Sequence, residues 1–255
     1  HIWLDTLGKK LLTAAATRVI VNSAATAAHL PASAKINIVH NGIELEKFDP
    51  SLDKRPFCQA FNIPPNAAVV GMVGRLRPWK GQGHFLKTAA DIAAQHSDVY
   101  FLIVGGSTFD VDERYPEQLK NMAESLQISD RVVFTGALEN IPQALAAMDI
   151  FVHPGEPEPF GLVNIEAMAM AKPVVAFAHG ALPEIVVEGE TGLLVTPYDT
   201  NALATAVLSL LHEPHRIKML GENGRLRVET NFAIEQTASQ IESIYHNILE
   251  KTAQP

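Results

Sequence analysis

Short runs of apolar, β-branched residues alternate with helical patterns through most of this chain. The apolar runs predict strands at residues 18–21, 36–39, 69–73, 99–104, 132–134, 150–152, 173–177 and 193–195. Helices are expected between them, at residues 82–95, 116–126, 141–148 and 162–171. Continuous apolar strands separated by helices indicate a parallel sheet that is covered on both faces. The sequence therefore predicts a doubly wound α/β domain, whose ligands bind at the carboxyl ends of its strands.

Turn-forming residues gather between residues 41 and 65 and mark the best domain boundary. Asn41-Gly42, Asp49-Pro50 and Pro64-Pro65 are typical of turns and linkers. We expect the tail of an amino-terminal domain at residues 1–48, a linker at 49–65, the main α/β domain at 66–230 and a carboxyl-terminal helix at 231–255. This last helix is expected to be amphipathic, with an apolar side formed by Ile234, Ala238, Ile241, Ile244, Tyr245 and Ile248.

The charge balance argues against nucleic acid as a partner. The 255 residues carry 20 basic and 28 acidic side chains, whereas a nucleic-acid footprint needs a basic excess. Cys58 is the single cysteine, which excludes a disulfide framework and fits a reducing compartment. No apolar run approaches the ~20 residues of a membrane span, so we expect a cytoplasmic protein. The chain begins at His1 within a helical pattern and without Met, as expected for the middle of a longer protein.

Two glutamates flank the expected start of one helix. Glu158 and Glu166 are eight positions apart, and Pro159 and Gly161 interrupt the helical pattern between them. Glu158 is therefore expected in a loop and Glu166 in the second helical turn. Backbone amides at this helix start would attract an anion; they belong to Phe160, Gly161, Leu162 and Val163. Acids beside an anion site fit a ligand that is also rich in hydroxyls, such as a nucleotide sugar. The alternative is an exposed helix acid at Glu166 and a macrodipole contact at Glu158.

A basic pair lies in the loop that follows the expected strand 69–73. In the segment Gly74-Arg75-Leu-Arg-Pro-Trp-Lys80-Gly81, Arg75 offers a planar fork of donors and Lys80 a compact charge. Because ligands bind at strand ends in this fold, the two side chains can neutralise a diphosphate. The alternative is a solvated loop with ordinary surface basics, since short basic motifs often match by chance.

Other polar positions carry weaker signals. Gly105 follows a strand, where it would let backbone approach a ligand, although a simple turn is favoured. Asp110 and Asp112 have the spacing of an acid-x-acid metal site, but no further ligands accompany them, and a solvated loop is favoured. His153 and His179 follow strands and can line the same cleft, although a structural role or simple exposure is favoured for each. No metal site is predicted.

Six motifs follow one another along the chain at the expected strand ends. They are Asn41-Gly42; Gly74-Arg75-Leu with Lys80-Gly81; Val104-Gly105; Val132-Val-Phe-Thr-Gly136; Glu158-Pro-Phe-Gly161 with Glu166-Ala-Met-Ala; and Pro183-Glu184-Ile with Gly189-Glu-Thr-Gly192. In this order they resemble the donor half of retaining GT-B glycosyltransferases of family 4, over roughly residues 14–245. The resemblance implies a Rossmann-like donor domain with a remnant of the amino-terminal acceptor domain.

The resemblance also implies an activity and a set of site residues. The enzyme would move a sugar from a UDP or GDP sugar to a glycan, lipid or small-molecule acceptor, with retention of configuration and without metal or cofactor. Arg75 and Lys80 would hold the diphosphate, Glu166 the ribose and Glu158 the donor sugar, so Glu158, Arg75 and Lys80 form the catalytic set. The full implied donor-binding set is Gly74, Arg75, Lys80, Gly105, Leu138, Glu158, Phe160, Gly161, Leu162, Val163 and Glu166.

Departures from the family pattern leave alternatives open. His179-Gly180-Ala-Leu stands where the family commonly has Gly-Gly before Pro-Glu, so the loop beside the donor sugar can differ. The amino-terminal domain is almost absent, and because the family's membrane-facing surfaces usually lie there, peripheral membrane association stays open. One alternative function is a fragment that binds nucleotide sugar and transfers nothing. Another is a sugar-nucleotide epimerase of the same fold, whereas a phosphorylase would need a cofactor lysine or phosphate-activating site that we cannot identify.

Overall fold

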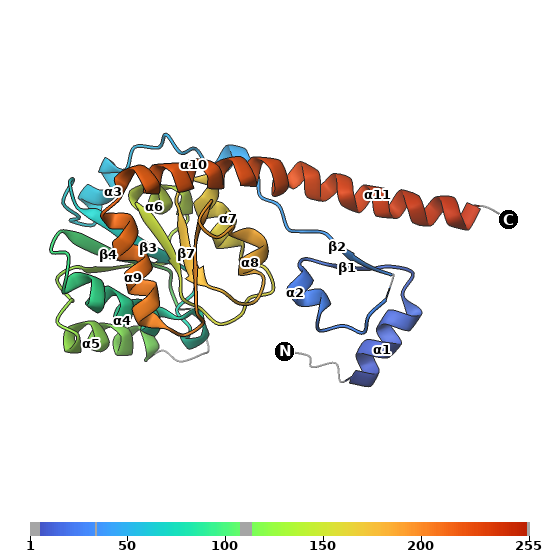
Figure 1. Ribbon diagram of the computed structural model, residues 1–255, viewed down its shortest axis with the longest axis horizontal. Helices are drawn as coiled ribbons and strands as arrows, with labels where there is room; N and C mark the ends of the chain where they lie inside the picture. Colours follow the sequence, from blue (N-terminus) through green and yellow to red (C-terminus); the bar gives the residue numbers. More distant parts are fainter. Residues whose placement is uncertain (1–5, 34, 108–113, 254–255) are drawn as a thin grey trace.

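The chain forms two parallel β-sheets in the computed structural model, which describes residues 6–33, 35–107 and 114–253 (Figure 1). The strands are β1 (Val19–Val21), β2 (Ile36–Ile38), β3 (Ala68–Val73), β4 (Val99–Val104), β5 (Val132–Gly136), β6 (Ile150–His153), β7 (Val174–Phe177) and β8 (Gly192–Val195). The α-helices are α1 (Thr6–Ala15), α2 (Ala24–Ala27), α3 (Arg55–Ala60), α4 (Gln82–Ala93), α5 (Tyr115–Ser125), α6 (Ile141–Ala147), α7 (Leu162–Ala169), α8 (Leu182–Ile185), α9 (Thr200–Leu211), α10 (Pro214–Asn231) and α11 (Ile234–Ala253). Short 3₁₀ helices are η1 (Leu45–Lys47) and η2 (Pro78–Lys80). Every predicted strand is observed, with ends that differ by two residues at most.

The larger sheet has the strand order β5-β4-β3-β6-β7-β8, and all its strands pair in parallel. β3 lies between β4 and β6, so the direction in which strands are added reverses between β3 and β6. Ligands of doubly wound sheets bind at such a reversal, outside the carboxyl ends of the strands. The doubly wound fold predicted from the sequence is confirmed, and the loops after β3 and β6 flank the expected ligand position.

Apolar side chains form a separate core on each face of this sheet. Successive strand residues point to opposite faces, so Val69 belongs to one core and Val70 to the other. Residues of α3, α6 and α7 close the core of Val69, and residues of α4, α5 and α9 close the core of Val70. Burial on both faces explains why the strands read as continuous apolar runs. These packed layers fix the strand ends from which the site loops start.

Residues 49–65, which the sequence predicts to be a linker, pack closely against the larger sheet. They contain α3, whose Phe57 and Cys58 are buried in the same core as Val69. Ile63 joins this core at the end of the segment. Part of this segment therefore belongs to the hydrophobic core of the larger unit. The limits of the domains stay predictions.

The amino-terminal elements and α11 extend away from the larger sheet (Figure 1). β1 and β2 pair in parallel and are accompanied by α1 and α2. The predicted last helix is observed, and its apolar side is only partly covered, since Tyr245 is 59% exposed. α1 likewise exposes Leu7 and Leu11.

Candidate functional site

The loops after β3 and β6 touch each other at the reversal of strand order. The first runs from Gly74 through η2 to Gly81, and the second, residues 154–161, is named the Glu158 loop. The backbone N–H of Glu156 donates to the carbonyl of Trp79 at 2.8 Å and joins the two loops. Gly81 allows the contact, because a Cβ there would lie 2.0 Å from the carbonyl oxygen of Pro154. Its φ of 82° also lies in the region that favours glycine.

Lys80 and Glu158, which the resemblance assigns to different parts of a donor, contact each other. Lys80 Nζ forms an ion pair with Glu158 Oε1, and the two side chains are 16% and 12% exposed. His153 Nε2 lies 3.4 Å from the same carboxylate oxygen, and its side chain is 5% exposed. His153 therefore contacts the predicted site residue Glu158, although the sequence favoured a structural role or simple exposure for this histidine. Its position at the end of β6, where ligands of this fold bind, is the sequence feature that could have identified it.

The Glu158 carboxyl is held in its ionised form. Burial raises its pKa, but hydrogen bonds and charges from His153 and Lys80 outweigh this effect and lower the pKa to about 2. The carboxylate only accepts hydrogen bonds, so His153 carries a proton on Nε2. Its buried Nδ1 has no hydrogen-bond partner in the described part of the chain. An ionised Glu158 can accept strong hydrogen bonds from sugar hydroxyls.

The start of α7 places backbone amides beside Glu158. Gly161 is the N-cap, with a φ of 89°, and the first-turn amides of Leu162 and Val163 have no acceptor within the helix. Phe160 is 2% exposed and its ring packs on His40, so this residue lies in the wall behind the helix start. This geometry fits the anion site that the sequence predicts at the helix start.

Glu166 lies in the second turn of α7, as predicted. Burial raises the pKa of its carboxyl, so it is more than an exposed helix acid. Among the described residues, no ion pair or side-chain hydrogen bond reaches this carboxylate. A partly buried acid without a protein partner is available to ligand hydroxyls.

The remaining predicted residues lie at the same edge of the sheet, and among the described residues no hydrogen bond or ion pair joins their side chains to Glu158. Arg75 is exposed in the β3 loop, and its backbone carbonyl accepts from Gln82 Nε2 at 2.9 Å. Gly105 follows β4, with its N–H donating to Gly136 at 3.0 Å. Leu138 follows β5 and is partly buried against the core of Val69. The sheet gives these residues a common edge, and Gly105 also packs on the β3 loop, since a Cβ there would lie 2.0 Å from the carbonyl oxygen of Gly74.

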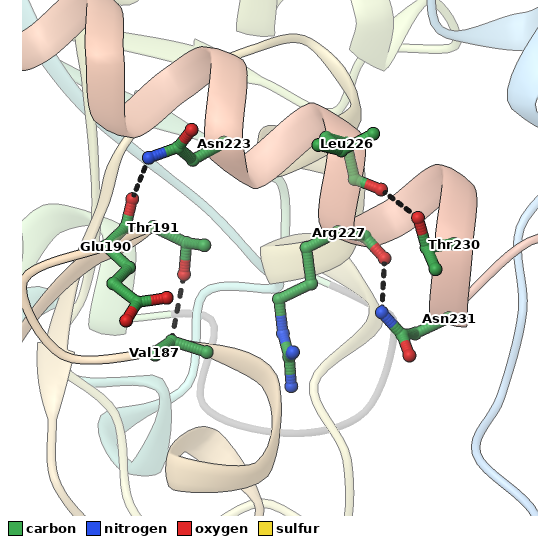
Figure 2. A pocket seen from close by; sticks show the side chains of 8 residues that line it. All are labelled: Val187, Glu190, Thr191, Asn223, Leu226, Arg227, Thr230 and Asn231. Carbon is green, nitrogen blue, oxygen red and sulfur yellow. Dashed lines mark hydrogen bonds between the residues drawn. The ribbon is translucent and has the colours of Figure 1, made fainter.

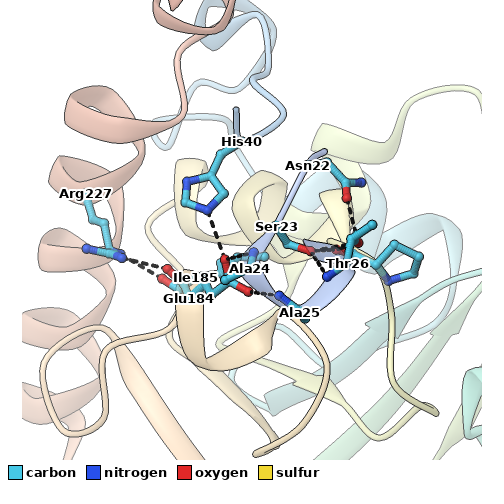
Figure 3. A network of polar contacts seen from close by, with 10 residues as sticks. Asn22, Ser23, Ala24, Ala25, Thr26, His40, Glu184, Ile185 and Arg227 are labelled. Atoms are coloured by element: carbon cyan, nitrogen blue, oxygen red, sulfur yellow. Dashed lines mark hydrogen bonds and ion pairs between the residues drawn. The ribbon is translucent and has the colours of Figure 1, made fainter. Parts of the chain in front are cut away.

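Glu184 joins the amino-terminal elements to the larger unit (Figure 3). Its carboxylate accepts from the backbone N–H groups of Ala24 and Ala25 at 2.8 and 2.9 Å, and it contacts His40 Nε2 at 3.1 Å. Arg227, from α10, donates to the backbone carbonyl of Glu184 at 2.8 Å and so holds the backbone of this residue in place. Burial raises the pKa of Glu184, but the two amides and His40 lower it overall. The charged acid is thus a fixed junction between segments far apart in sequence.

A cavity of about 210 Å³ lies where the amino-terminal elements meet the Glu158 loop. Beside this cavity, Ser23 Oγ donates a hydrogen bond to the carbonyl of Pro159 at 2.5 Å and so joins α2 to the Glu158 loop. The cavity is lined by Ala25, Thr26, His29, Pro157, Glu158, Pro159 and Gly180. Glu158 therefore faces a cavity that is formed by the amino-terminal elements on one side and by the larger unit on the other.

A larger cavity of about 320 Å³ lies between α10 and the loop that precedes β8 (Figure 2). It is lined by Val187, Glu190, Thr191, Asn223, Leu226, Arg227, Thr230 and Asn231, none of them a predicted site residue. Its polar groups bond one another, as where Asn223 donates to the carbonyl of Glu190 at 3.0 Å. Because it precedes a strand of a parallel sheet, it lies at the amino edge, away from the predicted site.

Neither a metal-binding cluster nor a membrane-spanning helix occurs within residues 6–33, 35–107 and 114–253. No three His, Cys, Asp or Glu side chains in these ranges gather in a way that could hold a metal ion. Asp110 and Asp112 lie outside the described residues. No helix within these ranges is both long and apolar enough to span a membrane.

The fold and the motif order together define a GT-B type of protein, and comparison with known families agrees. The chain belongs to the family described as Glycosyl transferases group 1, whose profile matches residues 53–227. It is 34% identical over 233 residues to the lipopolysaccharide core biosynthesis mannosyltransferase LpsB of Rhizobium meliloti (strain 1021), covering 91% of this chain and 66% of that protein.

Two solved structures share the fold over nearly the whole chain. Anabaena HepE in complex with UDP and glucose has 30% identity and a TM-score of 0.84, covering 94% of this chain and 66% of its own. Sucrose-phosphate synthase from Thermosynechococcus elongatus has 32% identity and a TM-score of 0.87, covering 96% and 62%. Among the first curated relatives, the chain spans 59% to 66% of their length.

Proposed function

We propose that this chain holds the nucleoside-diphosphate sugar of a glycosyltransferase that retains anomeric configuration and needs no metal. The observation that carries the proposal is the contact of Lys80 with Glu158 beside the amino end of α7, at the reversal of strand order. The HepE complex with UDP and glucose supports a nucleotide-sugar ligand for this fold. The LpsB relative favours acceptors of polysaccharide or glycolipid synthesis.

The proposed roles divide the donor between basic and acidic groups. Arg75, Lys80 and the first-turn amides of α7 take the diphosphate, while Glu166 accepts from the ribose and Glu158 from the sugar. In the free protein Glu158 neutralises Lys80; a bound phosphate would replace it and leave the carboxylate for hydroxyls. As the sugar–phosphate bond breaks, charge grows on the leaving diphosphate, and fixed donors stabilise that charge without reorganisation.

Calorimetric titration tests the donor assignment directly. UDP, GDP and ADP are titrated separately into the purified chain, with magnesium and with EDTA. We expect one of the three to bind, equally well in both buffers. Absence of binding by all three overturns the donor assignment, and binding that requires magnesium overturns metal independence.

The chain length favours a second candidate, a donor-binding unit that transfers nothing by itself. The chain covers no more than 66% of the first relatives, and few amino-terminal elements accompany the larger sheet. A transfer assay beside the titration separates the candidates, since binding without transfer to any acceptor supports the second. Release of free epimerised sugar would instead indicate the epimerase.

A further inference from the structure

Two histidines outside the proposed donor set hold the backbone of the Glu158 loop. His84 lies in the first turn of α4, and its Nδ1 is 3.1 Å from the carbonyl oxygen of Pro154. His179 follows β7, and its Nε2 is 2.9 Å from the carbonyl oxygen of Gly155. A carbonyl oxygen only accepts, so Nδ1 of His84 and Nε2 of His179 must each carry a proton. The two bonds therefore require the proton on different ring nitrogens, Nδ1 in His84 and Nε2 in His179.

The loop needs such external donors because of its own sequence. Pro154, Pro157 and Pro159 have no backbone N–H, so the segment has few donors with which to form turns of its own. Its other backbone anchors also lead outside the loop. The N–H of Glu156 donates to Trp79, and the N–H of Ala181 donates to the carbonyl of Glu158 at 3.1 Å.

Packing fixes the orientation of both imidazole rings. The Tyr198 ring lies edge-on to His84, with centroids 5.9 Å apart, and edge-on to His179, with centroids 5.6 Å apart. Phe177 contacts both histidines from β7. Burial, as the largest effect, lowers the pKa of His179 and favours its neutral ring. Tyr198 Oη also donates to Glu156 Oε2 at 2.6 Å, so the aromatic cluster and the loop are bonded to each other.

We propose that His84 and His179 are positioning residues, whose hydrogen bonds to the carbonyls of Pro154 and Gly155 place the Glu158 carboxylate for the donor sugar. This rests on the proposed function, because Glu158 is assigned there to the sugar. Neither histidine is assigned to the diphosphate or the ribose, so the affinity for the nucleoside diphosphate depends little on them. The affinity added by the sugar depends on both.

Amide side chains distinguish the hydrogen bond from mere packing. Asn places its amide nitrogen near the Nδ1 position of a histidine, and Gln places it near Nε2. His84→Asn and His179→Gln therefore keep the donors, whereas His84→Gln and His179→Asn displace them by one bond. His84→Leu and His179→Leu remove the donors and retain apolar volume. Binding of UDP and UDP-glucose to each variant is compared by calorimetry, with GDP and GDP-mannose as the parallel pair.

We expect the leucine and displaced-amide variants to lose about tenfold in affinity for the nucleotide sugar, as for one lost hydrogen bond of ~1.4 kcal/mol. Their affinity for the nucleoside diphosphate should change less than about twofold, and the matched His84→Asn and His179→Gln variants should stay near wild type. Equal losses for both ligands, or no rescue by the matched amides, would overturn the proposal. Should the leucine variants fail to fold, the displaced amides supply the same comparison.

Amide hydrogen exchange gives a readout that does not depend on ligand. In the leucine variants, the amides of Glu156 and Ala181 should exchange at least about tenfold faster, because the bonds they make depend on loop position. Unchanged exchange overturns the positioning role. If the wild-type chain binds no nucleotide, the proposed function fails, while the exchange experiment still decides whether the histidines hold the loop.

Discussion

At the scale of single residues, the ion pair of Lys80 with Glu158 gives each side chain a partner before any ligand is present. Both are mostly buried, so the pair is less screened than a surface contact. His153 adds a third polar group to the same carboxylate oxygen. Variants of this cluster are therefore expected to change ligand binding and stability together. The pH dependence of unfolding reports the effect on stability, and titration with ligand reports the effect on binding.

Replacing Lys80 by Ala tests the phosphate assignment. Removal of one fixed donor to a developing negative charge typically costs ~10²–10³ in rate, so in a protein that contains both domains we expect a loss of at least the lower figure. In this chain the same variant should weaken nucleoside-diphosphate binding and, because the mostly buried Glu158 loses its cationic partner, lower stability at neutral pH while the fold is kept. Lys120→Ala, on the exposed face of α5, is the control. Near-normal sugar transfer by the Lys80 variant would contradict the assignment.

Glu158→Gln should lower stability at neutral pH and lose this effect in acid. The folded pKa of about 2 lies below the ordinary value of 4.5, so ionised Glu158 stabilises the fold above pH 4.5. That shift corresponds to an upper value on the order of 3 kcal/mol. As the pH falls from 4.5 toward 2, the wild type loses this contribution and the two proteins converge. Urea unfolding from pH 7 to pH 3 measures it, and a pH-independent difference would be the contrary result.

Glu166→Gln should weaken ligand binding without lowering stability, in contrast to Glu158→Gln. Burial raises the folded pKa of Glu166 above the ordinary 4.5, so the ionised acid costs stability, and the cost grows as pH rises from 4.5 through the folded value. Glutamine removes that cost, so the variant should be at least as stable as wild type at pH 7. Its nucleoside-diphosphate affinity should fall, because a ribose acceptor is lost. Calorimetry and urea unfolding measure the two effects, and a destabilised variant with unchanged affinity would refute the ribose role.

At the scale of elements, the carboxyl ends of β3 and β6 are brought together by close backbone packing. Gly81 is the N-cap of α4, and that residue touches the loop that leads to α7. A helix start and a loop are thus fixed to each other without intervening side chains. The spacing of the phosphate and sugar groups of the proposed site depends on this contact.

Gly81→Ala tests that contact. Its Cβ would overlap the carbonyl of Pro154, so we expect a loss of several kcal/mol in stability and a displaced Glu158 loop. Gly189 is the matched control, since its φ of 73° is similar and nothing lies within 4 Å of a Cβ built there. Gly189→Ala should cost only the ~1–2 kcal/mol of the left-handed conformation. Urea unfolding compares them, and equal costs would show that the contact with Pro154 can relax.

At the scale of the whole molecule, hydrogen bonds to side chains attach the amino-terminal elements to the larger unit. Glu184 supplies three of them, to Ala24, Ala25 and His40. Ser23 supplies a further one, to the Glu158 loop. Because the cavity beside Glu158 is formed by both sets of elements, their attachment shapes the sugar side of the proposed site.

Glu184→Ala should loosen this attachment while leaving the larger sheet intact. The amides of Ala24 and Ala25 lose their acceptor, so their hydrogen exchange should accelerate at least about tenfold. Thermal unfolding of the main unit should change little, because Arg227 bonds to the backbone of residue 184 and not to its carboxylate. Glu190→Ala is the control for loss of an acid. Unchanged exchange at Ala24 and Ala25 would exclude Glu184 as the junction.

The sequence predicted the elements well because their signals are local. Apolar runs with helices between them predict buried parallel strands, and all eight predicted strands are observed. The break at Pro159 and Gly161 predicted the start of α7, and hence Glu166 in its second turn. Each of these inferences depends on neighbours in sequence, which fix backbone conformation directly.

The contacts between elements were decided by the tertiary structure. His153 and His179 carried no strong signal, because a histidine has no function until its neighbours in space are known. The pairing of Lys80 with Glu158 joins residues 78 positions apart, and the junction of Ala24 with Glu184 joins residues 160 apart. The strand order of the larger sheet brings Lys80 to Glu158, and the attachment of the amino-terminal elements to that unit brings Ala24 to Glu184. The sequence thus determined which chemical groups are present at the strand ends, while the folded arrangement decided which of them meet.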